Sequence, residues 1–408
     1  MTTLSLFALI LLGIVLQVGV AALVAFRKHW LAYEELLDRA SDVPARPAAA
    51  ATVVQPAWTG YRPFRVTTKT IEDLAGSVCS FRLAPADGGA VPSFLPGQFL
   101  TFRLSVAGSD RPIVRCYSLS DRPGMDTLRV SIKRVASGLS SNHFHDHVRE
   151  GDILDVKAPS GHFHLDPRGD GPVVLIAGGI GVTPLLSMAA ACLHENPDRE
   201  IWFFHGVRDG RERIMGGVLA EWAERHPRFH PHLCHSRPDA DAVEGRDFHH
   251  RGHVDIRLLR LSLPLKPFDF HICGPRAMLE SLVPALLDWG VPSTRIHYEA
   301  FGPASLPNLE SGAIPSDVSP PGGDPFTVTF ARSRRTVTWT PGAGSLLEVA
   351  EANGIPVESG CRAGGCGMCQ TRIESGQVTY DHSPDFDPEP GTCLLCLGRP
   401  KSNLVLSA

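Results

Sequence analysis

The sequence predicts a multidomain protein: a transmembrane helix, an antiparallel β-barrel, an α/β domain and a small cysteine-rich domain. Three observations carry this prediction. Residues 4–26 have no charge, residues 61–168 hold short alternating strands between turns, and apolar runs alternate with helical segments over residues 169–302. Five of the ten cysteines then fall in residues 326–408. A chain of 408 residues exceeds one ordinary core, so several domains are expected.

Composition excludes some classes of function. With 43% hydrophobic and 20% charged residues the chain is globular and not disordered. A formal net charge of −4 without a dominant basic stripe gives no reason to expect a nucleic-acid partner. The remaining five cysteines are scattered singly, as in proteins of reducing compartments.

The apolar run at residues 4–26 predicts a single-pass membrane anchor. Its 23 residues reach roughly 34 Å as a helix, enough for a hydrocarbon core of about 30 Å. The alternative is a cleaved signal peptide, but no Lys or Arg precedes the run, and signal cores are only about 7–15 residues long. Arg27 and Lys28 follow it, so the soluble domains are expected to face the cytoplasm.

Each later segment has its own pattern. Residues 27–60 predict a short juxtamembrane helix and an Ala/Pro-rich linker. Residues 61–168 predict the barrel, with half-buried strands such as 99–104. The continuous apolar run 173–177, followed by glycines and a helical pattern, is typical of a parallel strand in a Rossmann-like α/β domain at 169–302. Residues 303–325, rich in Pro, Gly and Ser, predict a linker to the last domain at 326–408.

The cysteine loop is the strongest chemical signal. Cys361, Cys366 and Cys369 give the spacing C-x4-C-x2-C, and Cys396 follows later, which suits four thiolates around the two irons of a [2Fe–2S] cluster. Loop glycines let the backbone aim N–H groups at the sulfurs. The alternative is a zinc site made from two C-x2-C pairs, one of them including Cys393, but it leaves Cys361 unused.

Residues 326–408 resemble a plant-type ferredoxin domain of the β-grasp fold, including a Cys-x3-Pro sequence after the fourth ligand. This resemblance implies that Cys393 is a bystander. It implies as cluster ligands Cys361, Cys366, Cys369 and Cys396.

A second motif, Arg115-Cys116-Tyr117-Ser118, follows the strand signal at 96–99. Arg can pair with a phosphate, Tyr can lie along a flavin ring, and Ser offers a hydroxyl to ring heteroatoms. Further on, Gly138 to Asn142 can cradle a pyrophosphate at a helix start, with Ser141 in its first turn.

A glycine turn follows the buried strand at 173–177. Gly178, Gly179 and Gly181 let the backbone approach a diphosphate, with Thr183 as the expected N-cap of the next helix and Pro184 as its first residue. A tight strand–helix turn also needs glycine for steric reasons alone, so the motif by itself leaves both uses open.

These motifs resemble the ferredoxin-reductase family, and residues 61–302 are similar to the reductase half of flavohaemoglobins. The resemblance implies FAD in the barrel and NADH or NADPH at the glycine turn, with FMN, used in the phthalate dioxygenase reductase branch, as the lesser option. The implied FAD residues are Arg115, Tyr117, Ser118, Gly138 and Ser141. The implied nucleotide residues are Gly178, Gly179, Gly181, Thr183, Pro184, Gly274 and Pro275.

The same resemblance assigns the reacting centre. Cys273, in Cys273-Gly274-Pro275, is expected beside the nicotinamide, although such a thiol can equally be a buried strand end. Glu299 is expected near the reactive edge of the flavin and Phe301 over it. The implied catalytic residues are Ser118, Cys273, Glu299 and Phe301.

Two further clusters invite functional readings. His143, His145 and His147 lack carboxylate or cysteine partners at ligand spacing, so a surface helix is expected in place of a metal site. The second cluster consists of three arginines, Arg208, Arg211 and Arg213. These side chains can bind the 2′-phosphate of NADPH and so select this nucleotide, or they can form a solvated basic turn. The likeness to flavohaemoglobins favours NADH.

The order anchor, FAD barrel, NAD(P) domain and ferredoxin implies a membrane-anchored NAD(P)H reductase. Electrons would pass through FAD and [2Fe–2S] to a membrane-associated oxygenase, desaturase or cytochrome, with the linker letting the ferredoxin domain swing. One alternative is an NADH:quinone reductase module, as in the flavoprotein subunit of sodium-translocating NADH:quinone reductase, where the ferredoxin precedes the flavin domain. A remote one is a non-catalytic zinc or redox-sensing membrane protein.

Overall fold

The structure is a computed structural model. It describes residues 57–106, 112–136, 138–300, 325–362, 364–380 and 388–408, together with Arg27, Pro384 and Phe386. The chain divides into two compact units, Met1–Gln55 and Pro56–Ala408. The predicted anchor at 4–26, almost all of the juxtamembrane segment and the linker residues 303–324 lie outside the described residues. Within the described part of the chain, no helix combines the length and apolarity that a membrane span requires.

The first domain is an antiparallel six-stranded sheet with the order β4-β3-β6-β1-β2-β5. An isolated bridge between Leu119 and Val130 joins the two edge strands and curls the sheet toward the predicted barrel. Aromatic rings fill its interior, among them Phe81, Phe102 and Phe144. The elements are β1 (Arg62–Ile71), β2 (Val78–Pro85), β3 (Phe99–Leu104), β4 (Ile113–Ser118), β5 (Leu128–Lys133), α2 (Leu139–Asp146) and β6 (Ile153–Val156).

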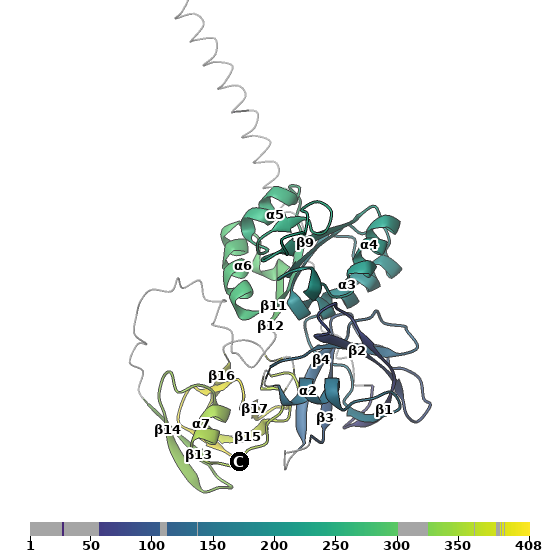
Figure 1. Cartoon of the computed structure of the whole chain (residues 1–408). Helices are drawn as coiled ribbons and strands as arrows, with labels where there is room; N and C mark the ends of the chain where they lie inside the picture. Colours follow the sequence, from purple (N-terminus) through teal and green to yellow (C-terminus); the bar gives the residue numbers. More distant parts are fainter. Residues whose placement is uncertain are drawn as a thin grey trace, which may run out of the picture. The chain divides into compact units, whose positions relative to one another are not determined.

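The second domain is a parallel six-stranded sheet with the order β10-β9-β8-β7-β11-β12. Helices cover both of its faces (Figure 1). Val173 and Leu175 of β7 pack into one core and Val174 and Ile176 into the other, which is why this strand reads as a continuous apolar run. The elements are β7 (Val173–Gly178), η1 (Gly179–Gly181), α3 (Val182–Glu195), β8 (Ile201–Val207), η2 (Gly210–Glu212), α4 (Gly216–Arg225), β9 (Phe229–His235), β10 (His250–Arg251), α5 (Ile256–Ser262), β11 (Asp269–Gly274), α6 (Arg276–Asp288), η3 (Ser293–Arg295) and β12 (Ile296–Ala300).

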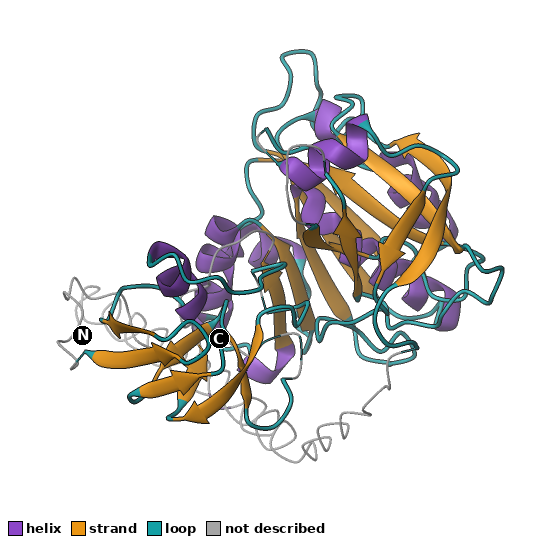
Figure 2. Ribbon diagram, turned by 90° about the horizontal axis from the view of Figure 1, so that it is seen from below, coloured by secondary structure: helices purple, strands orange, loops and turns teal. Residues whose placement is uncertain are grey.

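The third domain, which carries the C-terminus marked in Figure 2, is a mixed sheet with the order β14-β13-β19-β15-β17 and a separate pair, β16 and β18. Strands β13 and β19 pair in parallel, and α7 packs its apolar face into the same core. Ser345 and Glu348 form a capping box that fixes where α7 begins. The elements are β13 (Phe326–Phe330), β14 (Arg335–Trp339), α7 (Leu346–Ala352), β15 (Gln370–Ser375), β16 (Val378–Tyr380), β17 (Thr392–Leu394), β18 (Gly398–Pro400) and β19 (Leu404–Leu406).

A buried arginine ties the segment after the barrel to the α/β domain. Arg199, only 4% exposed, donates from Nη1 to the carbonyl of Asp166 at 2.7 Å and from Nε to the carbonyl of Gly171 at 2.9 Å. These carbonyls lie in the stretch that runs from the barrel into β7. Arg199 therefore fixes the strand that carries the glycine turn.

Replacing this arginine should destabilise the protein. Arg199→Met leaves two carbonyls without their charged donor, so we expect the free energy of unfolding to fall by about 2–5 kcal/mol. Urea unfolding followed by fluorescence measures the change. Arg228→Met is the matched control, because Arg228 is exposed and donates only to the carbonyl of Asp198. Equal midpoints for the two variants would contradict this role.

Candidate functional site: flavin, nucleotide and cluster

The predicted flavin motif lies on β4, where Tyr117 is held from two sides. Its hydroxyl is 2.8 Å from the Ser140 hydroxyl, and its ring meets Phe102 and Phe144 edge-on. Burial raises the pKa of Tyr117, which keeps the phenol protonated. Ser118, the next residue, is buried. The aromatic ring and the two hydroxyls therefore have fixed positions at one edge of the barrel.

The start of α2 offers an anion site beside this motif. Gly138 is the N-cap, and no side chain caps the first turn. A Cβ on Gly138 would lie 2.5 Å from the Ser141 hydroxyl, so a side chain at this position would displace that hydroxyl. The Ser141 hydroxyl accepts from the backbone N–H of Val135 at 3.2 Å. An uncapped helix start with serine hydroxyls, an arginine and a tyrosine nearby is a donor set that fits a flavin and its phosphates.

The glycine turn joins β7 to α3, but the helix begins earlier than the sequence predicts. Gly181 is the N-cap, and Thr183 is the second helical residue, its hydroxyl donating to the carbonyl of Ile180 at 3.1 Å. The prediction of Thr183 as N-cap and Pro184 as first residue is wrong. The reason is the 3-10 turn of Gly179–Gly181, which continues directly into the helix.

Close backbone approach requires the glycines of this turn. A Cβ on Gly181 would lie 2.2 Å from the carbonyl oxygen of Cys273, and one on Gly274 would lie 3.0 Å from Cα of Gly178. The carboxyl ends of β7 and β11 therefore pack backbone against backbone, and α3 starts there without a capping side chain. This arrangement fits a nucleotide diphosphate above the strand ends.

His205 of β8 supports the turn, although no sequence pattern points to this residue. Its Nε2 lies 3.0 Å from the carbonyl of Gly179, and its Nδ1 is buried without a partner. Burial lowers the pKa of His205 from 6.5 to about 4, so the ring is neutral near pH 7 and donates from Nε2.

Cys273 and Glu299 face each other across β11 and β12. They are register partners, and the Cys273 thiol donates to Glu299 Oε2 at 3.9 Å. Burial raises the pKa of Cys273 well above its ordinary range, with the Glu299 carboxylate adding to the effect, so the sulfur stays protonated. Gly274 ends β11 and Pro275 is the N-cap of α6. Phe301 lies outside the described residues.

The four predicted cluster ligands lie in two sulfur pairs. Cys361 lies next to Cys366 and raises the pKa of its thiol, while Cys396 lies next to Cys369 and lowers the pKa of the Cys369 thiol. Backbone N–H groups also point at the sulfurs, that of Cys361 at Cys366 Sγ (3.2 Å) and that of Gly365 at Cys361 Sγ (3.3 Å). No group of three or more His, Cys, Asp or Glu among the described residues is arranged around a single metal ion. Two pairs fit a cluster in which two irons share four thiolates.

Cys393 stays a predicted bystander of the cluster. Its side chain is fully buried in the third core, and burial raises its pKa to about 12, so it remains a neutral thiol.

The loop that carries Cys361, Cys366 and Cys369, here called the cluster loop (residues 360–369), contacts the first domain. The contact lies at the edge that carries the predicted flavin motif on β4, here called the flavin-binding edge. Arg115 Nη1 donates to the carbonyl of Gly360 at 3.0 Å, and Cys361 lies close enough to Cys116 to raise the pKa of the buried Cys116 thiol. Arg115 and Cys116 belong to the predicted flavin motif, and Cys361 to the predicted ligand set. The structure therefore brings two motifs that are far apart in the sequence into direct contact.

The two clusters with open functional readings have structural partners. His145 is buried with Nε2 at 2.8 Å from the carbonyl of Ile132, so it belongs to the packing of α2. Arg208 pairs with Glu212 at 2.6 Å. Arg211 and Arg213 line a cavity of about 620 Å³ at the ends of β8 and β9.

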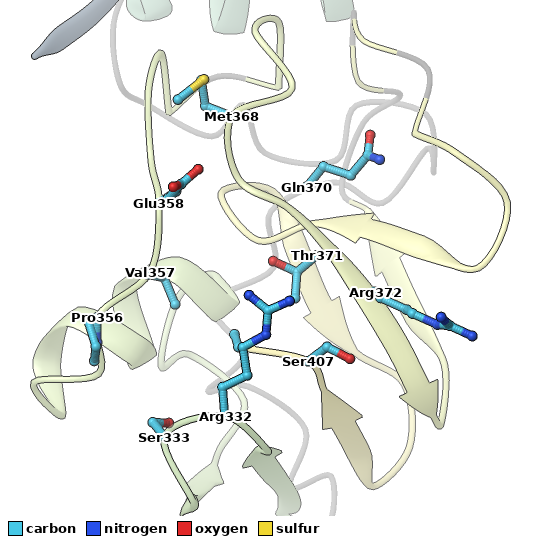
Figure 3. A pocket seen from close by; sticks show the side chains of 11 residues that line it. Arg332, Ser333, Pro356, Val357, Glu358, Met368, Gln370, Thr371, Arg372 and Ser407 are labelled. Atoms are coloured by element: carbon cyan, nitrogen blue, oxygen red, sulfur yellow. The ribbon is translucent and has the colours of Figure 1, made fainter.

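A second cavity lies within the third domain. It has a volume of about 430 Å³ and opens beside Met368, the neighbour of Cys369 (Figure 3). Its lining is polar and of mixed charge, with Arg332, Glu358 and Arg372. Met368 thus lines this groove and also contacts the Tyr61 hydroxyl of the first domain.

Comparison with known proteins identifies the class. Residues 64–165 match the oxidoreductase FAD-binding domain, residues 175–283 the oxidoreductase NAD-binding domain, and residues 328–401 the 2Fe-2S iron-sulfur cluster binding domain. The protein is thus an NAD(P)H-dependent oxidoreductase that uses FAD and a [2Fe–2S] cluster for electron transfer. These matches confirm the predicted cofactors over the zinc alternative.

The chain belongs to the ferredoxin-reductase-type NAD(P)H oxidoreductases. It is 38% identical over 275 residues to a flavohemoprotein of Bordetella pertussis, covering 66% of this chain and 68% of that protein. A flavohemoprotein of Halalkalibacterium halodurans is 34% identical over 279 residues, covering 67% of both.

Two solved structures are also similar. Phthalate dioxygenase reductase is 28% identical with a TM-score of 0.54, covering 86% of this chain and 98% of that one. The flavohem-like FAD/NAD-binding domain of a nitric oxide dioxygenase from Vibrio cholerae is 31% identical with a TM-score of 0.54, covering 60% of this chain and 99% of that one.

The close approach at Gly181 yields a testable prediction. Gly181→Ala pushes the ends of β7 and β11 apart, and such overpacking costs about 1–3 kcal/mol. We expect the KM for NAD(P)H to rise roughly five- to hundredfold while FAD and cluster contents are retained. Steady-state kinetics with an artificial acceptor measures this.

The control is a glycine that precedes β7, at the end of the strand away from the glycine turn. A Cβ on Gly171 would meet nothing nearer than Asp269 Oδ2 at 3.7 Å, so Gly171→Ala should leave KM unchanged. An unchanged KM in Gly181→Ala would show that the nucleotide does not depend on this turn.

Proposed function

We propose that this protein is a membrane-anchored reductase that delivers electrons from NAD(P)H to a membrane-associated oxygenase, desaturase or cytochrome. The observation that carries the proposal is the contact between the flavin motif and the cluster loop, where Arg115 donates to Gly360 and Cys116 reaches Cys361. This contact supports an electron path from the flavin to the cluster, with the cluster as the group that passes electrons to the acceptor. A carrier of single electrons suits acceptors that are themselves metal centres.

The described residues supply binding and orientation. FAD, when bound, accepts a hydride from NAD(P)H and releases single electrons to the cluster. The uncapped start of α2 and Arg115 would hold its phosphates, and Tyr117 would lie along the ring. Cys273 keeps its proton on Sγ, directed at Glu299, so the thiol adds no charge beside the carboxylate.

Three further observations support the choice of acceptor. The uncharged run at 4–26 favours an acceptor in or at the bilayer. Phthalate dioxygenase reductase is described as a modular structure for electron transfer from pyridine nucleotides to [2Fe-2S], and by name it serves a dioxygenase. The groove beside Met368 leaves one side of the cluster loop approachable by such a partner.

The anchor is tested by fractionation. We expect the full chain to sediment with membranes and to resist extraction by salt. Leu12→Arg places a charge at the centre of the run, which costs about 2.5–3.5 kcal/mol for insertion, and should move much of the protein to the supernatant. Leu12→Ala is the matched control and should stay in the membrane. A full chain found in the supernatant would contradict the anchor.

The acceptor is tested with the same preparation. We expect NAD(P)H to reduce an iron oxygenase or cytochrome in the native membrane. Oxidation of NAD(P)H should stop when that partner is removed. Rapid reduction of ubiquinone with no partner protein would favour the quinone reductase module instead.

A further inference from the structure

The cluster loop contacts residues that come from four neighbouring parts of the barrel wall. Strands β4, β3, β6 and β1 follow one another in the sheet. Each of them, or the residue directly beside it in the chain, contacts the cluster loop. The contacting residues are Tyr61 before β1, Phe99 in β3, Arg115 and Cys116 in β4, and Lys157 after β6.

Lys157 reaches the centre of this contact. Its Nζ donates to the carbonyl of Cys366, a predicted cluster ligand, at 3.1 Å and lies 5.5 Å from the ring centroid of Tyr61. Its backbone N–H is bound to the carbonyl of Thr101 at 2.9 Å, so the base of the side chain is fixed to the sheet. The Tyr61 hydroxyl itself lies 4.0 Å from Met368 Sδ.

The cluster loop directs some backbone N–H groups at its own sulfurs and two of its carbonyl oxygens at cations of the barrel. Its N–H groups at Cys361 and Gly365 point inward at sulfurs, while the carbonyls of Gly360 and Cys366 accept from Arg115 and Lys157. Hydrogen bonds from charged donors are stronger than neutral ones. Two cations of the barrel therefore hold the loop at Gly360 and at Cys366.

Glycine in the loop completes the fit. A Cβ on Gly365 would lie 2.8 Å from Cζ of Phe99, so the backbone of the loop rests directly on this ring. The contact is tight between the two positions that the cations hold.

We propose that Lys157 is a positioning residue that holds the cluster loop against the flavin-binding edge and thereby sets the rate of electron passage from flavin to cluster. The proposal rests on the electron order on which the proposed function also depends. Each NAD(P)H loses two electrons and one proton is released to solvent. The cluster takes one electron at a time, so two passages occur per NAD(P)H.

The test is single-turnover absorption spectroscopy of the full chain carrying Lys157→Met. Reduction of the flavin by NAD(P)H should proceed at the wild-type rate, because Lys157 lies on neither β7 nor β11. Reduction of the cluster should slow about tenfold or more, since a charge-assisted hydrogen bond is lost. Lys157→Arg, which restores a cationic donor, should recover most of the rate.

The control is Lys401→Met, which removes an exposed lysine from the third domain and should reduce its cluster at the wild-type rate. If Lys157→Met fails to retain its cluster, Lys157→Gln, which keeps an N–H donor without the charge, is measured in its place and should be slowed less than tenfold but measurably.

Wild-type cluster reduction in both Lys157→Met and Lys157→Gln would overturn the proposal, as would an arginine variant as slow as the methionine one. A wild-type chain whose flavin is not reduced by either nucleotide would instead contradict the proposed function. The two failures are therefore distinguishable.

Discussion

The contact between β4 and the cluster loop is the interaction on which the electron path depends. Arg115 donates to the carbonyl of its neighbour Val114 and to that of Gly360, so one guanidinium belongs both to the flavin motif and to the cluster loop. Residues that are 245 positions apart in the chain meet there. Electron transfer needs short separations between carriers, and this contact lets the protein supply one without a second polypeptide.

The nucleotide side depends on a second constraint, the close packing of two strand ends. Side chains at Gly181 or Gly274 would collide with backbone atoms, so glycine alone lets β7 and β11 meet. His205 then braces the turn through the carbonyl of Gly179 while remaining neutral. Arg199 holds the segment that leads into the same strand. Packing at the core of this domain therefore shapes the edge that receives the nucleotide.

Much of this architecture could be predicted from local patterns. The glycine turn, the apolar run of β7 and the cysteine spacing depend on residues that are near each other in the sequence, and their periodicity reports the fold directly. The N-cap of α3 is Gly181 and not the predicted Thr183, two residues earlier in the chain. The 3-10 turn of Gly179–Gly181 runs directly into the helix, and the sequence pattern does not distinguish the two kinds of turn. Lys157 and Tyr61 could not be found this way, because their partners lie in another domain.

The order in which flavin and cluster are reduced can be followed directly in the full chain under argon. NADH or NADPH is mixed with the protein while absorption follows the flavin and electron paramagnetic resonance follows the cluster. We expect the flavin to be reduced first and the cluster signal to appear afterwards without any added protein. A cluster that stays oxidised while the flavin is fully reduced would contradict the path through the contact of β4 with the cluster loop.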